Sequence, residues 1–226
     1  MRLEDSPFRP GWWGTDLRDV GLGDVRPRVS TYGCYDFARL PPLPYRLSGG
    51  LDWLTGARDY SPNIGEERSK ENVAAFAELQ SVVEFKGIRL PAAFTKLFST
   101  QSLQQRIRSN TDCFLDLCAN VVPSAVGQGH LIRFLADSQG CIFWYVYLTE
   151  DGSDHAVVSS PDFYGTEAER WSDAEADPSA IVFSAESFED FLCRFWLENE
   201  IWFAEYEKTP MPQAGRTYIE RYKRGV

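Results

Sequence analysis

A chain of 226 residues fits one medium-sized domain, or one domain with an appendage. Its composition, 43% hydrophobic and 14% aromatic, supplies a packed core and excludes a chain that is disordered throughout. The longest unbroken apolar run, 141–148, is far shorter than the roughly 20 residues of a membrane-spanning helix. The first residues lack the apolar stretch of a secretory signal, and five cysteines form no disulfide framework. We therefore expect a soluble, globular, cytoplasmic protein.

Acidic residues are concentrated in about a quarter of the chain. The whole chain carries 33 acidic and 23 basic residues, a formal net charge of −10. Residues 150–208 hold sixteen acidic against three basic residues, residues 1–149 are balanced, and 209–226 form a basic C-terminal tail. A negative field repels nucleic acid and anionic membranes and attracts basic partners, so we expect no nucleic acid and no membrane as partner. The same stretch also fits a solvated face that only keeps the protein in solution.

Residues 1–65 are rich in both helix breakers and aromatic side chains. They hold seven of the 13 prolines and nine of the 17 glycines, which discourages long regular elements. Nine aromatic residues fall in the same stretch, more than a flexible tail would carry. We expect an irregular extension packed on the main domain, with its best strand at 28–37.

Two helices are predicted after this extension. The first spans 69–84, with Ser69 as its cap and an apolar stripe along one side. Gly87 ends it in a left-handed conformation, and Pro91 restarts the chain at a first helical position. The alternating residues 113–118 then predict a strand whose two cysteines face opposite sides, which makes them a poor pair of metal ligands.

The clearest pattern is a group of strands between residues 129 and 160. We expect strands at 131–137, 141–148 and 156–160, joined by short turns and therefore consecutive antiparallel neighbours. The middle strand is apolar throughout, so it is predicted to be central and buried on both faces. A further short strand is expected at 180–183.

A long helix is predicted over 186–206, capped by Ser184. It should pack on the sheet, or, with its widened apolar surface, offer a groove to a partner. The side chains expected on its inner face are Phe188, Phe191, Leu192, Phe195, Trp202 and Tyr206.

The motifs of known catalytic and metal sites are missing from the sequence. Only two histidines occur, His130 and His155, and no zinc-ligand spacing, nucleophile elbow or phosphate-binding glycine loop is found. Glu150, Asp151 and Asp154 crowd a turn and could hold calcium, but they lack the twelve-residue loop pattern, so a solvated turn is favoured. We predict no metal, no cofactor and no enzymatic activity.

Three segments together resemble the SUKH superfamily, the SMI/KNR-like domains. They are the helix end and restart EFKGIRLPAAF at 84–94, the strand and turn LIRFLADSQG at 131–140, and the helix start SAESFEDFL at 184–192. The resemblance implies an α+β domain over 66–208, with helices around an antiparallel sheet. Residues 1–65 have no counterpart in it, and 99–105 replace the usual glycine-rich turn.

The resemblance also implies binding and not catalysis. Bacterial members look like immunity proteins, antitoxins that neutralise polymorphic toxins, often nucleases or deaminases, by occluding their active sites. A toxin that grips nucleic acid has a cationic cleft, which an acidic protein can fill with rapid, electrostatically steered association. The alternative is a regulatory or scaffolding interaction module without a toxin partner.

The predicted binding surface combines a hairpin tip with the acidic loop that follows it. Trp171 is its expected anchor, because tryptophan in a polar segment finds little core and is enriched at the energetic centres of interfaces. The alternative is that Trp171 folds back on the sheet and the acids are solvated. The carboxylates expected to set association rate and salt dependence are those of Glu150, Asp151, Asp154, Asp162, Glu167, Glu169, Asp173, Glu175 and Asp177.

Overall fold

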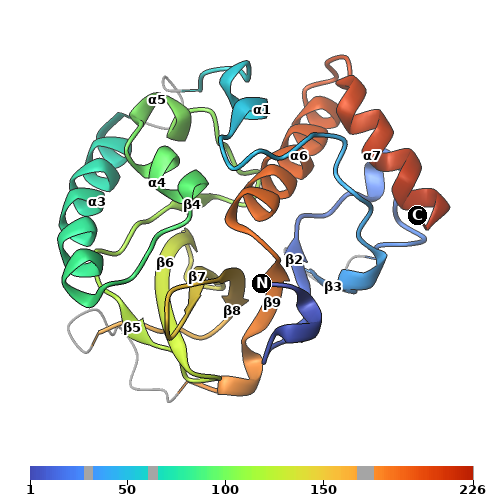
Figure 1. The fold of residues 1–226 in the computed structure, drawn as a ribbon. Coiled ribbons are helices and arrows are strands. Elements are labelled where there is room, and N and C mark those ends of the chain that lie inside the picture. The colour runs from blue at the N-terminus through green and yellow to red at the C-terminus, as the bar shows by residue number, and fades with distance from the viewer. Residues whose placement is uncertain (28–32, 61–65, 167–175, 226) are drawn as a thin grey trace.

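A seven-stranded sheet lies at the centre of the fold (Figure 1). The computed structural model describes residues 1–27, 33–60, 66–166 and 176–225. The strands run in the order β1–β9–β8–β7–β6–β4, with β5 also paired to β6. All pairs are antiparallel except β1 with β9, so the chain is an α+β protein with a mostly antiparallel sheet, as predicted. The strands are β1 (Arg9–Pro10), β4 (Cys113–Leu115), β5 (Val122–Pro123), β6 (Gly129–Asp137), β7 (Phe143–Thr149), β8 (His155–Ser160) and β9 (Val182–Ala185).

The predicted arrangement of the three clearest strands is confirmed. β6, β7 and β8 are consecutive antiparallel neighbours, and β7 lies between the other two. Six of its seven residues are buried, as its unbroken apolar sequence required. The strand predicted over 113–118 is shorter, since β4 ends at Leu115.

Four helices cover one face of the sheet: α3 (Glu66–Lys86), α4 (Ala92–Phe98), the short α5 (Gln101–Gln104) and α6 (Phe188–Tyr206). α3 is longer than the predicted 69–84. Gly87 ends it with φ +69°, and the Ile88 N–H bonds back to the Val83 carbonyl, as a left-handed terminus requires. Pro91 is extended and precedes α4, so it does not occupy a helical position.

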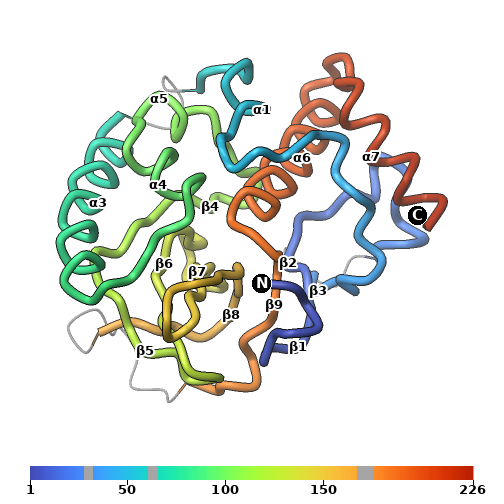
Figure 2. The backbone as a smooth tube through the Cα atoms, in the orientation of Figure 1, coloured from blue at the N-terminus to red at the C-terminus, as the bar shows by residue number. Residues whose placement is uncertain are grey.

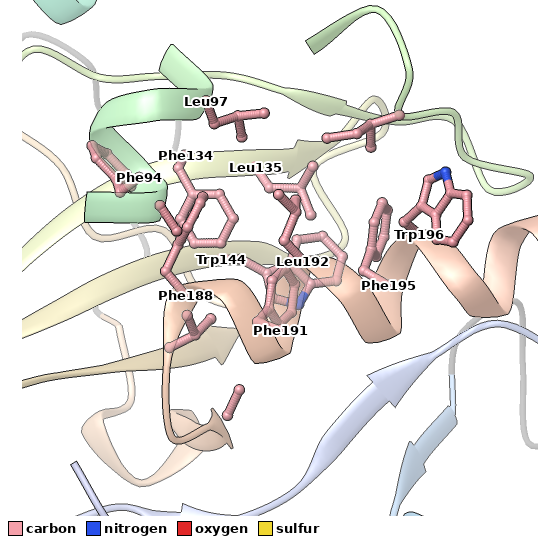
Figure 3. Packing of buried hydrophobic residues seen from close by; sticks show 14 of the residues in the cluster. Phe94, Leu97, Phe134, Leu135, Trp144, Phe188, Phe191, Leu192, Phe195 and Trp196 are labelled. Carbon is pink, nitrogen blue, oxygen red and sulfur yellow. The ribbon is translucent and has the colours of Figure 1, made fainter. Parts of the chain in front are cut away.

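Phenylalanine rings join α6 to the sheet (Figure 3). The Phe188 ring packs edge-on at 5.0 Å from Phe134 of β6, and Phe191 lies 5.5 Å from the same ring. Phe195 reaches Trp144 of β7 at 6.2 Å. The predicted packing of α6 is therefore confirmed for these three residues.

Two details of the predicted helix are wrong. Its cap is Ser187, whose hydroxyl accepts a hydrogen bond from the Asp190 N–H at 3.1 Å, while Ser184 lies inside β9. Tyr206 was expected on the inner face but is 71% exposed, because the last turn of α6 extends beyond the sheet.

The N-terminal segment packs on the main domain. β1 lies beside β9 at one sheet edge (Figure 2). β2 (Trp12–Gly14) and β3 (Gly33–Tyr35) form a separate two-stranded sheet, and Trp12 is fully buried against Phe191. β3 lies within the strand expected at 28–37, of which 28–32 are outside the described residues. Short helical turns complete the segment: Leu3–Asp5, Arg18–Val20, Phe37–Arg39 and α1 (Asp52–Thr55).

The C-terminal residues form a helix that packs on α6. α7 (Gln213–Arg224) lies at the outer side of the molecule in Figure 1, beyond α6. Its Tyr218 is fully buried and Tyr222 nearly so, whereas Arg216, Lys223 and Arg224 are exposed and Arg221 is half-buried. A single amphipathic helix thus accounts for most of the basic tail.

Candidate functional site

Two of the three acidic residues in the hairpin between β7 and β8 accept hydrogen bonds. The Thr149 hydroxyl and the Ser153 N–H donate hydrogen bonds to Asp151, which lowers the pKa of this exposed carboxyl to about 2. Asp154 accepts a hydrogen bond from the amino group of Met1 at 2.8 Å. Glu150 is exposed. This arrangement is a hydrogen-bonded turn that carries negative charge.

Asp162 and Asp177 lie together at the other end of β8. The Asp177 N–H donates to the Asp162 carboxylate at 2.8 Å, and Asp177 itself accepts from the Ser179 N–H. The pKa of Tyr164 is raised to about 12, mainly because the hydroxyl is partly buried and also because these two carboxylates are negatively charged. Since the six residues of β8 span roughly 20 Å, this pair is well separated from the hairpin tip.

The predicted acidic surface is therefore seen only in part. The described carboxylates form two groups, at opposite ends of one strand. The remaining predicted residues lie outside the described residues: Glu167, Glu169, Trp171, Asp173 and Glu175.

Two carboxylates of α6, those of Glu189 and Glu198, are buried, which the charge count could not show. Glu198 is 1% exposed and binds the fully buried guanidinium of Arg26 through two hydrogen bonds of 2.6 and 2.8 Å. The Trp12 indole N–H at 3.0 Å and the Tyr218 hydroxyl at 2.8 Å donate to the same carboxylate. The negative charge of Glu198, one of the sixteen acidic residues counted in 150–208, is thus neutralised inside the protein and does not reach its surface.

Glu189 is a second inward-facing carboxylate of α6. It accepts hydrogen bonds from the backbone N–H groups of Gly49 and Leu51 and from the Trp53 indole. It therefore fixes the segment before α1 to the start of α6.

Near the C-terminal end of α6, two more carboxylates hold Arg108. Its guanidinium lies 2.9 Å from Glu200 and 2.7 Å from Glu207, and it stacks 3.7 Å from the centre of the Phe203 ring. The Tyr60 ring covers it from another side at 4.2 Å. This flank of the helix end is an occupied arginine site.

The opposite flank of the same helix end carries exposed aromatic rings. The Tyr206 ring stacks on Trp202, with the ring centres 4.8 Å apart and the planes at 15°. Trp202 is half-buried. A hollow of about 200 Å³ opens beside this stack, and its lining includes Asp16, Asp19, Glu205 and Lys208. We call this region the α6-end surface: Trp202, Glu205 and Tyr206 with the facing residues 16–20.

A larger hollow of about 380 Å³ lies on the flank that holds Arg108. It is bounded by α3, α5, β4 and the end of α6, and Arg68, Asn72, Gln105, Phe114, Phe203 and Glu207 are among its lining residues. The end of α6 therefore forms a ridge between two hollows. The side-chain amide of Asn72 links the elements around the larger hollow, because its NH₂ group donates hydrogen bonds to the Gln104 side chain and to the Leu115 carbonyl.

Sequence reasoning missed the α6-end surface because it placed Trp202 and Tyr206 on the inner face of the helix. The available signal was the acidic Glu205 between them, together with their distance along the helix from Phe195, whose ring packs on Trp144 of β7. Within the described residues, no group of histidine, cysteine, aspartate and glutamate side chains is placed to hold a metal ion.

Comparison of this chain with protein-family models, curated proteins and solved structures finds no match. None of the helices in the described ranges combines the length and apolar character needed to cross a membrane.

Proposed function

We propose that this chain is a non-enzymatic, protein-binding domain of the SUKH type. In this role it is an immunity protein that neutralises a polymorphic toxin, such as a nuclease or deaminase, by occluding the active site. The order of elements supports the proposal: α3 ends at Gly87, α4 follows the Leu90-Pro91 restart, antiparallel strands come next, and α6 packs back on them.

The exposed Trp202–Tyr206 stack is the observation that carries a binding role. Aromatic side chains of this size gain most from burial, yet the ring of Tyr206 is left 71% exposed. Tryptophan and tyrosine are enriched among the residues that dominate interface energies, typically where hollows accept the partner's side chains. A partner seated on the α6-end surface would cover this stack.

The charge of the surface favours a basic partner. Asp16, Asp19 and Glu205 line the hollow beside the stack, against Lys208 alone. Carboxylates at the rim of an interface accelerate association with a cationic surface, such as the cleft with which a nuclease grips its substrate. The groups at Asp162–Asp177 and at the hairpin tip extend the negative field.

A regulatory or scaffolding module without a toxin partner is the second proposed function. It uses the same surface and differs in the partner. A neighbouring gene for a large secreted protein favours the immunity function, and a partner encoded elsewhere favours the module.

Affinity capture from native cell extract with the full chain, followed by mass spectrometry, tests the proposal. We expect one dominant basic partner, and Tyr206→Ala should weaken its binding at least tenfold, the size of a typical aromatic hot spot of about 2 kcal/mol. Tyr206 contributes little to the core, so the variant should have the same free energy of unfolding in urea as the parent chain.

Phe85→Ala is the matched control. Phe85 is 92% exposed but lies at the far end of α3, roughly 25 Å along the helix from Arg68 at the larger hollow. Binding that is unchanged in Tyr206→Ala, or lost equally in Phe85→Ala, would contradict a binding surface at the end of α6.

A further inference from the structure

The end of α6 holds an arginine on one flank and offers a similar site on the other. Arg108 shows what the occupied flank provides: an aromatic face at Phe203 and carboxylates at Glu200 and Glu207. These three positions follow the helical repeat and share one side of the helix. The chain thus contains its own example of a guanidinium held by a ring and two carboxylates at this helix end.

The opposite flank presents the same combination of groups. Trp202, Glu205 and Tyr206 lie on the other side of the helix by the same repeat. They face Asp16 and Asp19 across a hollow of about 200 Å³. None of the arginines in the described part of the chain lines this hollow.

We propose that this hollow binds one arginine side chain of a basic partner protein, an inference that rests on the proposed protein-binding function. The guanidinium stacks against the Trp202–Tyr206 aromatic surface and pairs with the carboxylates at the rim. The hollow binds an arginine of the partner in the way that the other flank of the helix end binds Arg108 of this chain.

The carboxylates of the hollow remain able to bind a cation. Asp19 is exposed and makes no ion pair within the described ranges. Glu205 pairs with Lys208, whose side chain is 75% exposed, and such a surface pair is readily exchanged for a better one. Asp16 pairs with Arg18 at 2.9 Å and keeps its position at the rim. With Arg18 and Lys208 counted against Asp16, Asp19 and Glu205, the hollow keeps a net charge of −1, carried by Asp19.

Arginine fits this site better than lysine. A guanidinium is planar and weakly hydrated, so it stacks on a ring and binds a carboxylate with two hydrogen bonds, whereas an ammonium group is a compact, strongly hydrated charge. Among the described residues, each cation–π contact is made by an arginine, at rings that include Tyr35, Phe114 and Phe163. The fold thus pairs its aromatic rings with guanidinium groups.

Titration with N-acetyl-L-arginine amide tests the proposal directly. The full-length protein is followed by the indole N–H signals in ¹H–¹⁵N NMR spectra, with the Trp202 signal assigned from Trp202→Phe. We expect that signal to shift until it saturates, with a dissociation constant in the millimolar range, because only one side chain binds. N-acetyl-L-lysine amide should bind at least about fivefold more weakly.

Two variants and one control make the result specific. Tyr206→Ala removes the stacked ring and Asp19→Asn removes the rim charge, and each should weaken arginine amide binding at least about fivefold. Phe85→Ala should bind as the parent chain does, because its exposed ring lies far from the hollow. Equal binding of the two amides, or unchanged binding in both Tyr206→Ala and Asp19→Asn, would overturn the arginine site.

The site and the proposed function can fail separately. Arginine amide binding without any captured protein partner supports the site and contradicts the function. A captured basic partner whose affinity is the same for the parent chain, Tyr206→Ala and Asp19→Asn overturns the arginine site while the protein-binding function stands.

Discussion

At the scale of single residues, Glu198 connects parts of the chain that are far apart in sequence. Its carboxylate binds Arg26 and Trp12 from the N-terminal segment and Tyr218 from α7. All these groups are buried, so each charge depends on its partners for the solvation that it has lost. Removing one partner is therefore far more damaging than removing an exposed pair.

Glu198→Gln should destabilise the fold by about 3–5 kcal/mol, because the variant leaves the Arg26 guanidinium buried without its counter-charge. The measurement is the free energy of unfolding from urea denaturation. Glu66→Gln is the control: Glu66 pairs with Lys70 on the surface of α3, and its loss should cost less than about 1 kcal/mol. A Glu198→Gln variant as stable as this control would contradict the structural role of the buried pair.

At the scale of elements, the start of α6 depends on a cap at Ser187, where the sequence analysis expected Ser184. Ser184 and Ser187 both precede the apolar stripe, and both have the side chain that an N-cap requires. The choice is made by β9, which continues to Ala185 and keeps Ser184 in the strand, where its hydroxyl lies 2.7 Å from that of Ser159.

Ser187→Ala should destabilise the protein by about 1 kcal/mol, because it removes the acceptor for the Asp190 N–H. Ser187→Asp should restore most of the loss, since aspartate caps helices as well as serine does and its charge suits the positive end of the dipole. Urea unfolding of the three proteins measures both effects. If aspartate fails to restore what alanine removes, the hydrogen bond to Asp190 is not the reason for the loss.

Elements with strong local patterns were predictable from the sequence. The apolar run of β7, the short turns on either side of it and the stripe of α6 identified the three antiparallel strands and the helix that packs on them. β1 was not predictable, because two residues pair with a strand more than 170 residues later and leave no periodicity. The α6-end surface escaped prediction for a related reason: the helical repeat does not tell where the sheet beneath a helix stops.

At the scale of the whole molecule, charge counted along the sequence is a poor guide to charge at the surface. Arg26 and Arg108 come from the balanced part of the chain, yet Arg26 pairs with Glu198, and Arg108 with Glu200 and Glu207, in the acidic part. Among the described residues, the surface field therefore depends on the acids at the α6 end, at the hairpin tip and at Asp162–Asp177.

The predicted binding role of the acidic loop around Trp171 can be tested with the same captured partner. Trp171→Ala should weaken binding by about 2 kcal/mol without loss of stability if Trp171 is an interface anchor. Charge reversal at Asp173 and Glu175 should slow association, and added salt should slow it further, in stopped-flow or surface-binding kinetics. Normal binding by Trp171→Ala, with an association rate that is unchanged by charge reversal at Asp173 and Glu175, would restrict the interface to the α6 end.

The ion pair of Arg26 with Glu198 also sets an order of events during synthesis on the ribosome. The two residues are 172 positions apart, so at 5–20 residues per second Arg26 emerges roughly 10 to 30 s before its partner exists. During that interval Trp12 likewise lacks both the carboxylate that its indole binds and the Phe191 ring against which it packs. The segment that holds Trp12 and Arg26 therefore docks only after α6 has left the ribosome, although it is made long before that helix.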